Sequence, residues 1–220
     1  MISVAIDGPA GAGKSTISRK VSAELGFIYV DTGALYRSIA YSLNMEGIKT
    51  DEIAKIEEKL GRTSINIEFI DGEQHVMVDG EDVSHKIRTP EISMLASAFS
   101  AIPEVRAFLL ELQRKMAREN NVIMDGRDIG TVVLPDATLK IFLTADPEDR
   151  ARRRYEEMLE KGQKADYNEV LEDIKKRDYN DSHSAVAPLK PAEGAVICNT
   201  TGNTLEQSVE QLYNLIKANI

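Results

Sequence analysis

A glycine-rich segment close to the N-terminus has the residue types and spacing of a phosphate-binding loop. Gly8, Gly13, Lys14 and Ser15 match the pattern G-x-x-x-x-G-K-[ST], which follows the apolar residues 2–6 and opens a segment with helical spacing. Glycines let successive backbone N–H groups converge on phosphate oxygens, and the start of a helix adds positive potential there. Lys14 supplies a mobile positive charge, and the Ser15 hydroxyl suits Mg²⁺, a hard cation. This segment therefore predicts a site for a nucleoside triphosphate with Mg²⁺.

The whole loop and the first helical turn are expected to contact the triphosphate: Gly8, Pro9, Ala10, Gly11, Ala12, Gly13, Lys14, Ser15 and Thr16. ATP is favoured over GTP because the sequence holds neither an Asn-Lys-x-Asp string nor an Asp-x-x-Gly switch string. Ser15 is the predicted metal ligand. Asp7 and Asp125, at the ends of predicted strands, are both candidates to hold Mg²⁺ through water.

Short apolar runs bounded by turn residues predict five buried parallel strands, at residues 2–6, 27–30, 122–124, 139–143 and 195–197. Segments with helical spacing lie between most of these runs, which is the βαβ pattern of a doubly wound sheet. Residues 61–83 instead alternate apolar and polar residues around the dipeptides Asp71-Gly72 and Asp79-Gly80. The sequence therefore predicts an α/β fold, a doubly wound five-stranded parallel sheet with a small antiparallel insert.

Size and charge exclude several classes of protein. The 220 residues suit one large domain or a domain with insertions. The net charge of −9 repels nucleic-acid backbones, so a nucleic-acid binder is disfavoured. No run approaches the roughly 18 apolar residues of a membrane span, and Met1 leads straight into a predicted strand, so we expect a cytoplasmic protein. The single cysteine, Cys198, fits a reducing compartment and is expected to be a buried strand residue.

Two further segments follow predicted strands and carry residues that can bind phosphate. In residues 31–37, Thr32 fits the N-cap of a helix, and Tyr36 and Arg37 fall one turn later. An arginine at this place can bind phosphate through two N–H groups. Residues 125–128, Asp-Gly-Arg-Asp, follow the third strand. Because doubly wound sheets bind ligands at the carboxyl ends of their strands, we expect both segments to line one crevice.

Taken together, the motifs resemble those of bacterial cytidylate kinases. The strings that carry the resemblance are I-D-G-P-A-G-A-G-K-S, D-T-G-A-L-Y-R, G-E-D-V-S-x-x-I-R, D-G-R-D-I-G-T-V-V-L-P-D-A, I-F-L-T-A, R-x-x-R-R and R-D-Y-N-D-S, with A-P-L following. They occur in order along the whole chain. Several of them distinguish this kinase from other proteins with a phosphate-binding loop.

The resemblance implies a nucleoside monophosphate kinase that uses Mg²⁺ and transfers the γ-phosphoryl group of ATP to CMP or dCMP. It implies that Thr32, Arg37 and Arg127 hold the CMP phosphate with Tyr36 packing along the nucleotide, that Ser97, Arg106 and Asp128 address the cytosine edge, and that Arg177 and Asp181 hold the ribose and phosphate. The chemistry of the base agrees, because the Asp128 carboxylate can accept from the cytosine amino group but faces an acceptor, O4, in uracil.

The segment after the fourth predicted strand carries four arginines in five residues, at 150 and 152–154. The resemblance implies a mobile helical lid that brings one or two of Arg150, Arg153 and Arg154 onto the transferring phosphoryl group. For any single arginine the alternative is an ion pair on the helix surface. The predicted catalytic residues are Lys14, Arg127, Arg150 and Arg153.

The implied layout is a single kinase domain over residues 1–220. Its core comprises 1–40, 84–148 and 185–220, its NMP-binding insert spans about 41–83, and its lid spans about 149–184. One position departs from the family: Ser184 stands where an arginine that contacts the base is usual, three residues after Asp181. We therefore expect a looser cytosine clamp, or compensation by a side chain such as His183.

Other functions stay open at this point. One is a related kinase that acts on UMP, AMP or shikimate, or that accepts UMP and CMP alike. Another is a regulatory module that binds ATP without a small acceptor; a basic face or tail would be its sign, and the sequence has no basic block. We expect a monomer, from the family resemblance, with CMP, dCMP and ATP as partners and with neither nucleic acid nor membrane.

Overall fold

A computed structural model describes residues 1–70, 73–184 and 186–220. The predicted turn dipeptide Asp71-Gly72 lies outside these residues. The chain divides into two compact units, one formed by residues 1–30 and 117–220 and the other by residues 31–116. The predicted boundaries of the insert and the lid divide the chain by function, and they stay a prediction.

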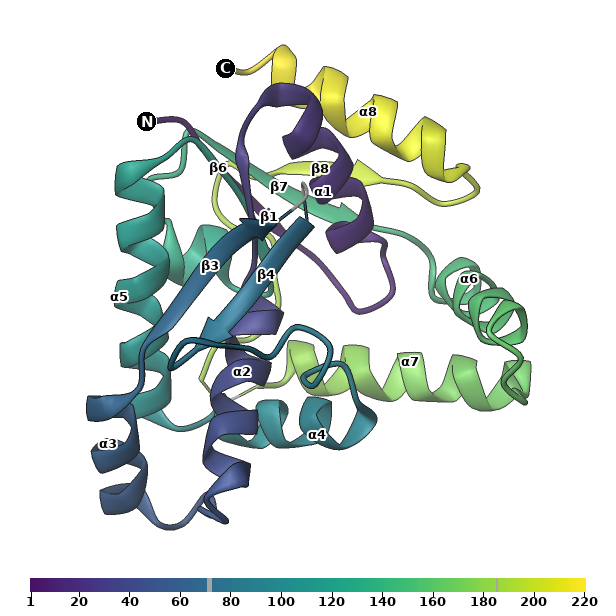
Figure 1. Cartoon of the computed structure of the whole chain (residues 1–220). Helices are drawn as coiled ribbons and strands as arrows, with labels where there is room; N and C mark the ends of the chain where they lie inside the picture. The colour runs from purple at the N-terminus through teal and green to yellow at the C-terminus, as the bar shows by residue number, and fades with distance from the viewer. Residues whose placement is uncertain (71–72, 185) are drawn as a thin grey trace. The chain divides into compact units, whose positions relative to one another are not determined.

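The first unit is built on the five-stranded parallel sheet that the apolar runs predict (Figure 1). The strands are β1 (Ser3–Asp7), β2 (Ile28–Asp31), β6 (Val122–Gly126), β7 (Leu139–Thr144) and β8 (Val196–Asn199), in the spatial order β2-β6-β1-β7-β8. The central strand β1 pairs with β6 and β7, and Ser3 lies opposite Val122. This order brings the carboxyl ends of β1 and β6 together, where the phosphate-binding loop and the Asp-Gly-Arg-Asp segment begin.

Apolar side chains from the sheet and two helices form the core of this unit. The helices α1 (Lys14–Leu25) and α8 (Leu205–Lys217) pack against each other (Figure 1). The buried cluster includes Val4, Ile6, Ile17, Val21, Ile123, Ile141, Leu143, Cys198, Leu212 and Ile216. Cys198 is a buried residue of β8, as predicted, and burial raises the pKa of its thiol.

Three further elements complete the first unit around the carboxyl ends of the strands. The five-residue turn η1 (Ile129–Val133), a wide helical turn, follows β6. The helices α6 (Pro147–Glu160) and α7 (Tyr167–Ser182) lie side by side between β7 and β8 in the sequence (Figure 1). The long helix α7 begins at the N-cap Asp166, whose side chain accepts from the backbone N–H groups of Asn168 and Glu169.

The second unit combines helices with the predicted antiparallel sheet. Its elements are α2 (Thr32–Met45), α3 (Ile53–Arg62), β3 (Ile65–Ile70), β4 (Glu73–Val78), β5 (Glu81–Asp82), α4 (Pro90–Phe99) and most of α5 (Pro103–Glu119). The three strands pair antiparallel in the order β3-β4-β5, which confirms the small antiparallel sheet expected for residues 61–83. Helix α2 packs against α4 and β4.

Among the described residues, no single helix has the length and apolar composition needed to cross a membrane. Helices α4 and α5 meet both criteria only when counted together, and they are bent by 100° at the break between them.

The start of α8 offers a direct test of local stability, because Thr204 and Gln207 cap it reciprocally. Thr204 Oγ1 accepts from the Gln207 backbone N–H at 3.2 Å, and the Thr204 N–H donates to Gln207 Oε1 at 2.9 Å. Thr204→Ala is expected to lower the free energy of unfolding by about 1 kcal/mol, measured by urea denaturation. Thr204→Ser keeps the hydroxyl and is the matched control. Equal midpoints for Thr204→Ala and the wild type would contradict this account of the cap.

Candidate active site

The phosphate-binding loop connects β1 to α1 and follows a backbone path that glycine allows. A Cβ at Gly8 would lie 1.9 Å from the Leu143 carbonyl oxygen of β7, so no larger residue fits there. Gly11 and Gly13 have φ values of 74° and 85°, in the left-handed region that favours glycine. Gly13 is also the N-cap of α1. The strand, loop and helix therefore occur in the order that the motif predicts.

Lys14 is buried at the first position of α1, with 6% of its surface exposed. Its ammonium group donates to the backbone carbonyls of Gly8 at 2.7 Å and Pro9 at 2.9 Å. Burial, followed by repulsion from the Arg127 guanidinium, lowers the pKa of Lys14 to about 7, while Asp125, Asp7 and Asp181 oppose this shift. Lys14 thus lies close enough to these groups to share one electrostatic environment with them.

The two candidate carboxylates for Mg²⁺ have different partners. Asp125 Oδ2 accepts from the Ser15 hydroxyl at 3.0 Å, and its Oδ1 accepts from the Tyr29 hydroxyl at 2.7 Å. Asp7 instead accepts from the backbone N–H groups of Ile129 at 2.7 Å and Gly130 at 2.8 Å. Burial raises the pKa of Asp7, and these two hydrogen bonds oppose the rise. Both oxygens of Asp7 thus hold the start of η1.

The pair of Ser15 and Asp125 suits Mg²⁺ by its chemistry. It combines a hydroxyl with a carboxylate, and Mg²⁺ is commonly held by one or two carboxylates together with substrate phosphates and water. The part of the chain that the structure describes contains no cluster of three or more histidine, cysteine or acidic side chains that could hold a metal without phosphate.

The segment after β6 meets α7 through an ion pair. Arg127 Nε donates to Asp181 Oδ2 at 2.8 Å, which joins two predicted acceptor residues that lie 54 positions apart in the sequence. Asp128 is buried before η1, and its carbonyl accepts from the Val132 N–H at 2.8 Å. Arg177 is exposed one turn before Asp181 on α7. Arg127, Asp128 and Asp181 thus all belong to the first unit, which also holds the phosphate-binding loop. Their roles toward CMP stay predictions.

In the second unit, the start of α2 corrects one prediction. The N-cap is Asp31 and not Thr32, because Asp31 still has the extended conformation of β2 and its carboxylate accepts from the Ala34 N–H at 2.8 Å. Thr32 is buried as the first residue of α2, with Tyr36 one turn later.

Arg37 lies over this same turn, held by Asp31 Oδ2 at 3.2 Å. A Cβ at Gly33 would lie 3.1 Å from Arg37 Nη1, so glycine lets the guanidinium approach the helix. The buried Nε of Arg37 has no hydrogen-bond acceptor among the described residues. A buried donor without a partner carries a desolvation cost that an anion would remove.

The predicted base-reading residues of this unit lie near the junction of α4 and α5. Ser97 is exposed on α4, and its carbonyl accepts from the Ser100 hydroxyl at 2.8 Å. Arg106 of α5 is half-buried, with Nη1 3.4 Å from the Ser100 carbonyl. These contacts place Ser97 and Arg106 within one local cluster.

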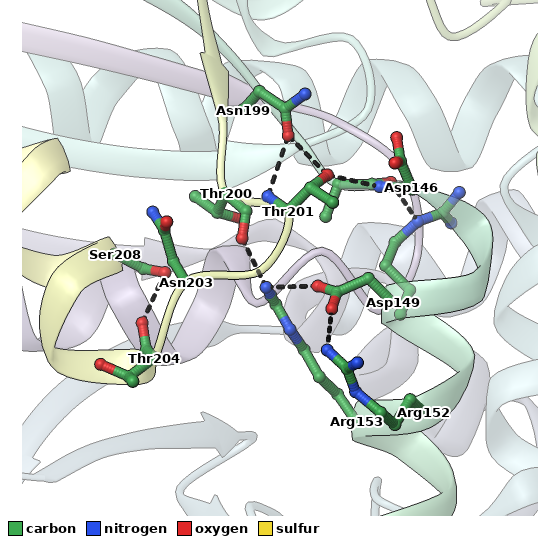
Figure 2. Close-up of polar contacts among 12 residues, drawn as sticks. Asp146, Asp149, Arg152, Arg153, Asn199, Thr200, Thr201, Asn203, Thr204 and Ser208 are labelled. Carbon is green, nitrogen blue, oxygen red and sulfur yellow. Dashed lines mark hydrogen bonds and ion pairs between the residues drawn. The ribbon is translucent and has the colours of Figure 1, made fainter.

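All three candidate lid arginines contact groups of the protein, and Arg154 pairs with Glu157 at 2.8 Å. Arg150 has 3% of its side chain exposed and forms a two-pronged ion pair with Asp178, at 3.0 and 2.6 Å. Arg153 contacts the Thr200 carbonyl at 2.5 Å and Asp149 Oδ2 at 2.6 Å, while Arg152 pairs with the other Asp149 oxygen (Figure 2). That Arg150 or Arg153 contacts a phosphoryl group stays a prediction. For this contact, the arginine would have to leave the protein groups that it binds in this structure.

Comparisons with known proteins relate this chain to one enzyme family. Residues 4–218 match the family model described as cytidylate kinase. A cytidylate kinase from Caldicellulosiruptor saccharolyticus is 51% identical over 214 residues, 97% of this chain and 95% of that protein. One from Caldanaerobacter subterraneus subsp. tengcongensis is 52% identical over 218 residues, 99% of this chain and 96% of that protein.

A solved structure of an uncharacterized protein from Eubacterium ventriosum covers 99% of both chains with a TM-score of 0.53 at 13% identity, which shows a shared fold. The family model extends over nearly the whole chain, and about half of the residues are identical to those of full-length relatives. The chain belongs to the cytidylate kinase family.

Proposed function

We propose that this protein transfers the γ-phosphoryl group of ATP to CMP or dCMP and releases ADP with CDP or dCDP. The observation that carries the proposal is the convergence of Lys14, Ser15, Asp125 and Arg127 at the carboxyl ends of β1 and β6. A loop that binds a triphosphate beside an arginine suited to a second phosphate favours transfer between two nucleotides. The relatives named cytidylate kinases support CMP as the acceptor.

The reaction needs placement and neutralisation of charge more than covalent participation by the protein. An oxygen of the CMP phosphate attacks the γ-phosphorus of ATP, and the bond to the bridging oxygen of ADP breaks. The acceptor is already an anion, so no general base is required. Lys14, the loop N–H groups and Arg127 are proposed to stabilise charge on the transferring group. Ser15 and Asp125 would hold Mg²⁺, which supplies further neutralisation of the phosphate oxygens when bound.

The acceptor-binding residues are proposed in the groups that the family resemblance implies. Thr32, Arg37 and Arg127 would bind the CMP phosphate, and the unpartnered Nε of Arg37 supports this role. Tyr36 would pack along the nucleotide, Arg177 and Asp181 would hold the ribose and phosphate, and Ser97, Arg106 and Asp128 would contact cytosine. The last group can distinguish cytosine from uracil, because a carboxylate matches an amino donor.

Arg150 and Arg153, the two lid arginines predicted to be catalytic, differ in how firmly the protein holds them. The Arg153 side chain is 27% exposed, which makes it our first candidate for contact with the phosphoryl group. Arg150 is 3% exposed, and its guanidinium would have to leave Asp178 to act on phosphate.

We also propose that the enzyme acts as a monomer in the cytoplasm, within pyrimidine nucleotide metabolism, and that its partners are CMP, dCMP and ATP. The net charge of −9 supports the absence of a nucleic-acid partner.

The direct test of the proposal is ADP release from Mg·ATP with CMP, dCMP, UMP, AMP and GMP offered in turn. CMP and dCMP are expected to give the highest kcat/KM. Lys14→Ala should lower kcat by about 100-fold or more, because it removes a charge aimed at the transferring group. Lys20→Ala, on the exposed side of α1, is the matched control.

Retained turnover in Lys14→Ala would contradict the assigned role of the loop. If UMP is phosphorylated about as efficiently as CMP, the protein is still a nucleoside monophosphate kinase, but the proposed selectivity for cytosine is wrong. If no acceptor stimulates ADP release, an ATP-binding regulatory module explains the chain better.

Base selectivity is expected to depend on Asp128. Asp128→Asn replaces a carboxylate that only accepts with an amide that can also donate to uracil O4. The ratio of kcat/KM for CMP to that for UMP should therefore fall by about tenfold or more. Asp136→Asn, at an exposed position after η1, is the control. An unchanged ratio in Asp128→Asn would assign base recognition to other residues.

The lowered pKa of Lys14 predicts that ATP binding takes up a proton. With a pKa of about 7 in the free protein, the Lys14 amine is mostly neutral at pH 8, whereas bound triphosphate favours its charged form. Affinity for ATP should therefore fall as pH rises above 7. Calorimetry at pH 8 in buffers of different ionisation enthalpy should report uptake of about one proton.

Lys14→Arg should abolish this uptake, because its guanidinium stays protonated throughout the range. Equal proton uptake by Lys14→Arg and the wild type would refute the assignment of the titrating group to Lys14.

A further inference from the structure

Helix α7 is linked both to the phosphate-binding loop and to Arg127, a residue predicted to bind CMP. In its C-terminal part, Asp178 binds the Arg150 guanidinium, which also donates to the Ala10 carbonyl of the loop at 2.9 Å. One turn later, Asp181 binds Arg127 at 2.8 Å. The two aspartates lie three residues apart on one helix. Asp178 is linked to the loop expected to bind ATP, and Asp181 is linked to Arg127, which is expected to bind CMP.

Arg150 is held too tightly for a surface ion pair. Four hydrogen bonds engage its guanidinium: one to the Ala145 carbonyl at 2.8 Å, one to Ala10 and two to Asp178. The side chain is 3% exposed, so the charge is buried and Asp178 compensates it. A fork-to-carboxylate pair of this kind fixes orientation as well as position.

Packing at Gly11 gives a second, independent connection between α7 and the loop. A Cβ at Gly11 would lie 3.6 Å from Arg150 Cβ and 3.9 Å from Ile174 Cδ1. Ile174 is buried on α7, one turn before Asp178. Both side chains therefore lie next to Gly11, which makes α7 a neighbour of the phosphate-binding loop at this point.

We propose that Asp178 is a positioning residue that, through Arg150, couples the ATP loop to the acceptor residues on and around α7. The inference rests on the proposed function. When CMP engages Arg127 and Asp181, α7 is held in place, and Asp178 then holds Arg150 against Ala10. ATP, by ordering the loop, stabilises the same arrangement from the other side. Coupling of this kind is reciprocal, so each nucleotide tightens the binding of the other by one common factor.

The test is calorimetric titration of CMP with and without a saturating non-hydrolysable ATP analogue and Mg²⁺. The wild type should bind CMP about fivefold or more tightly when the analogue is present. The reverse titration should give the same factor. Asp178→Asn should bring the factor close to one, and Asp173→Asn, an exposed change on the same helix, should keep it at the wild-type value.

A second variant guards against loss of folding, because Asp178→Asn leaves the Arg150 charge buried without its partner. The double change Arg150→Gln with Asp178→Asn removes both charges and should fold, with a coupling factor close to one. Asp178→Glu, which keeps the carboxylate, should recover part of the coupling.

A wild-type coupling factor in the folded double variant overturns the inference, and so does a factor of one in the wild type. A loss of kcat with unchanged coupling would instead assign Arg150 to the phosphoryl group. If the wild type does not phosphorylate CMP at all, the proposed function fails, and the inference fails with it.

Discussion

The arrangement of functional groups in the first unit depends on the burial of the Lys14 ammonium group. The amine can remain within the protein only because carbonyls of its own loop and nearby carboxylates offset its desolvation. Each carboxylate also makes a second contact, since Asp7 holds the start of η1, Asp125 binds the Ser15 hydroxyl, and Asp181 orients Arg127. The groups that balance the charge of Lys14 therefore also position the other functional groups of this unit.

In the second unit, the corresponding feature is a cationic side chain, Arg37, held at the start of helix α2. Asp31 caps α2 and at the same time binds Arg37, while Gly33 leaves room for the guanidinium. Positive potential from the helix and from Arg37 favours an anion at this position. A carboxylate that serves both as cap and as counter-ion orients the arginine before any ligand binds, which lowers the ordering cost of binding.

The sequence predicts well what depends on local pattern. Apolar runs gave the five parallel strands, alternation around Asp79-Gly80 gave the antiparallel sheet, and the loop motif appears in its expected strand-to-helix context. Thr32 was wrong as an N-cap because Asp31, which ends a strand, is an equally good capping residue, and spacing alone does not choose between them. The partners of Arg150, and the choice between Asp7 and Asp125 beside Ser15, depend on contacts distant in sequence. Asp178 was overlooked, although its spacing from the apolar Ile174 and from Asp181 marks one face of a helix.

We propose above that the γ-phosphoryl group passes to the phosphate of a cytidine nucleotide and not to water. Phosphorus-31 NMR of the enzyme with Mg·ATP and CMP tests it directly, because the monophosphate group of CMP, the diphosphate groups of the products and inorganic phosphate give separate signals. We expect the CMP signal to be lost as fast as that of ATP, with two nucleoside diphosphates formed for each ATP consumed and little inorganic phosphate. Formation of one nucleoside diphosphate and one inorganic phosphate for each ATP, with the CMP signal unchanged, would contradict transfer to CMP.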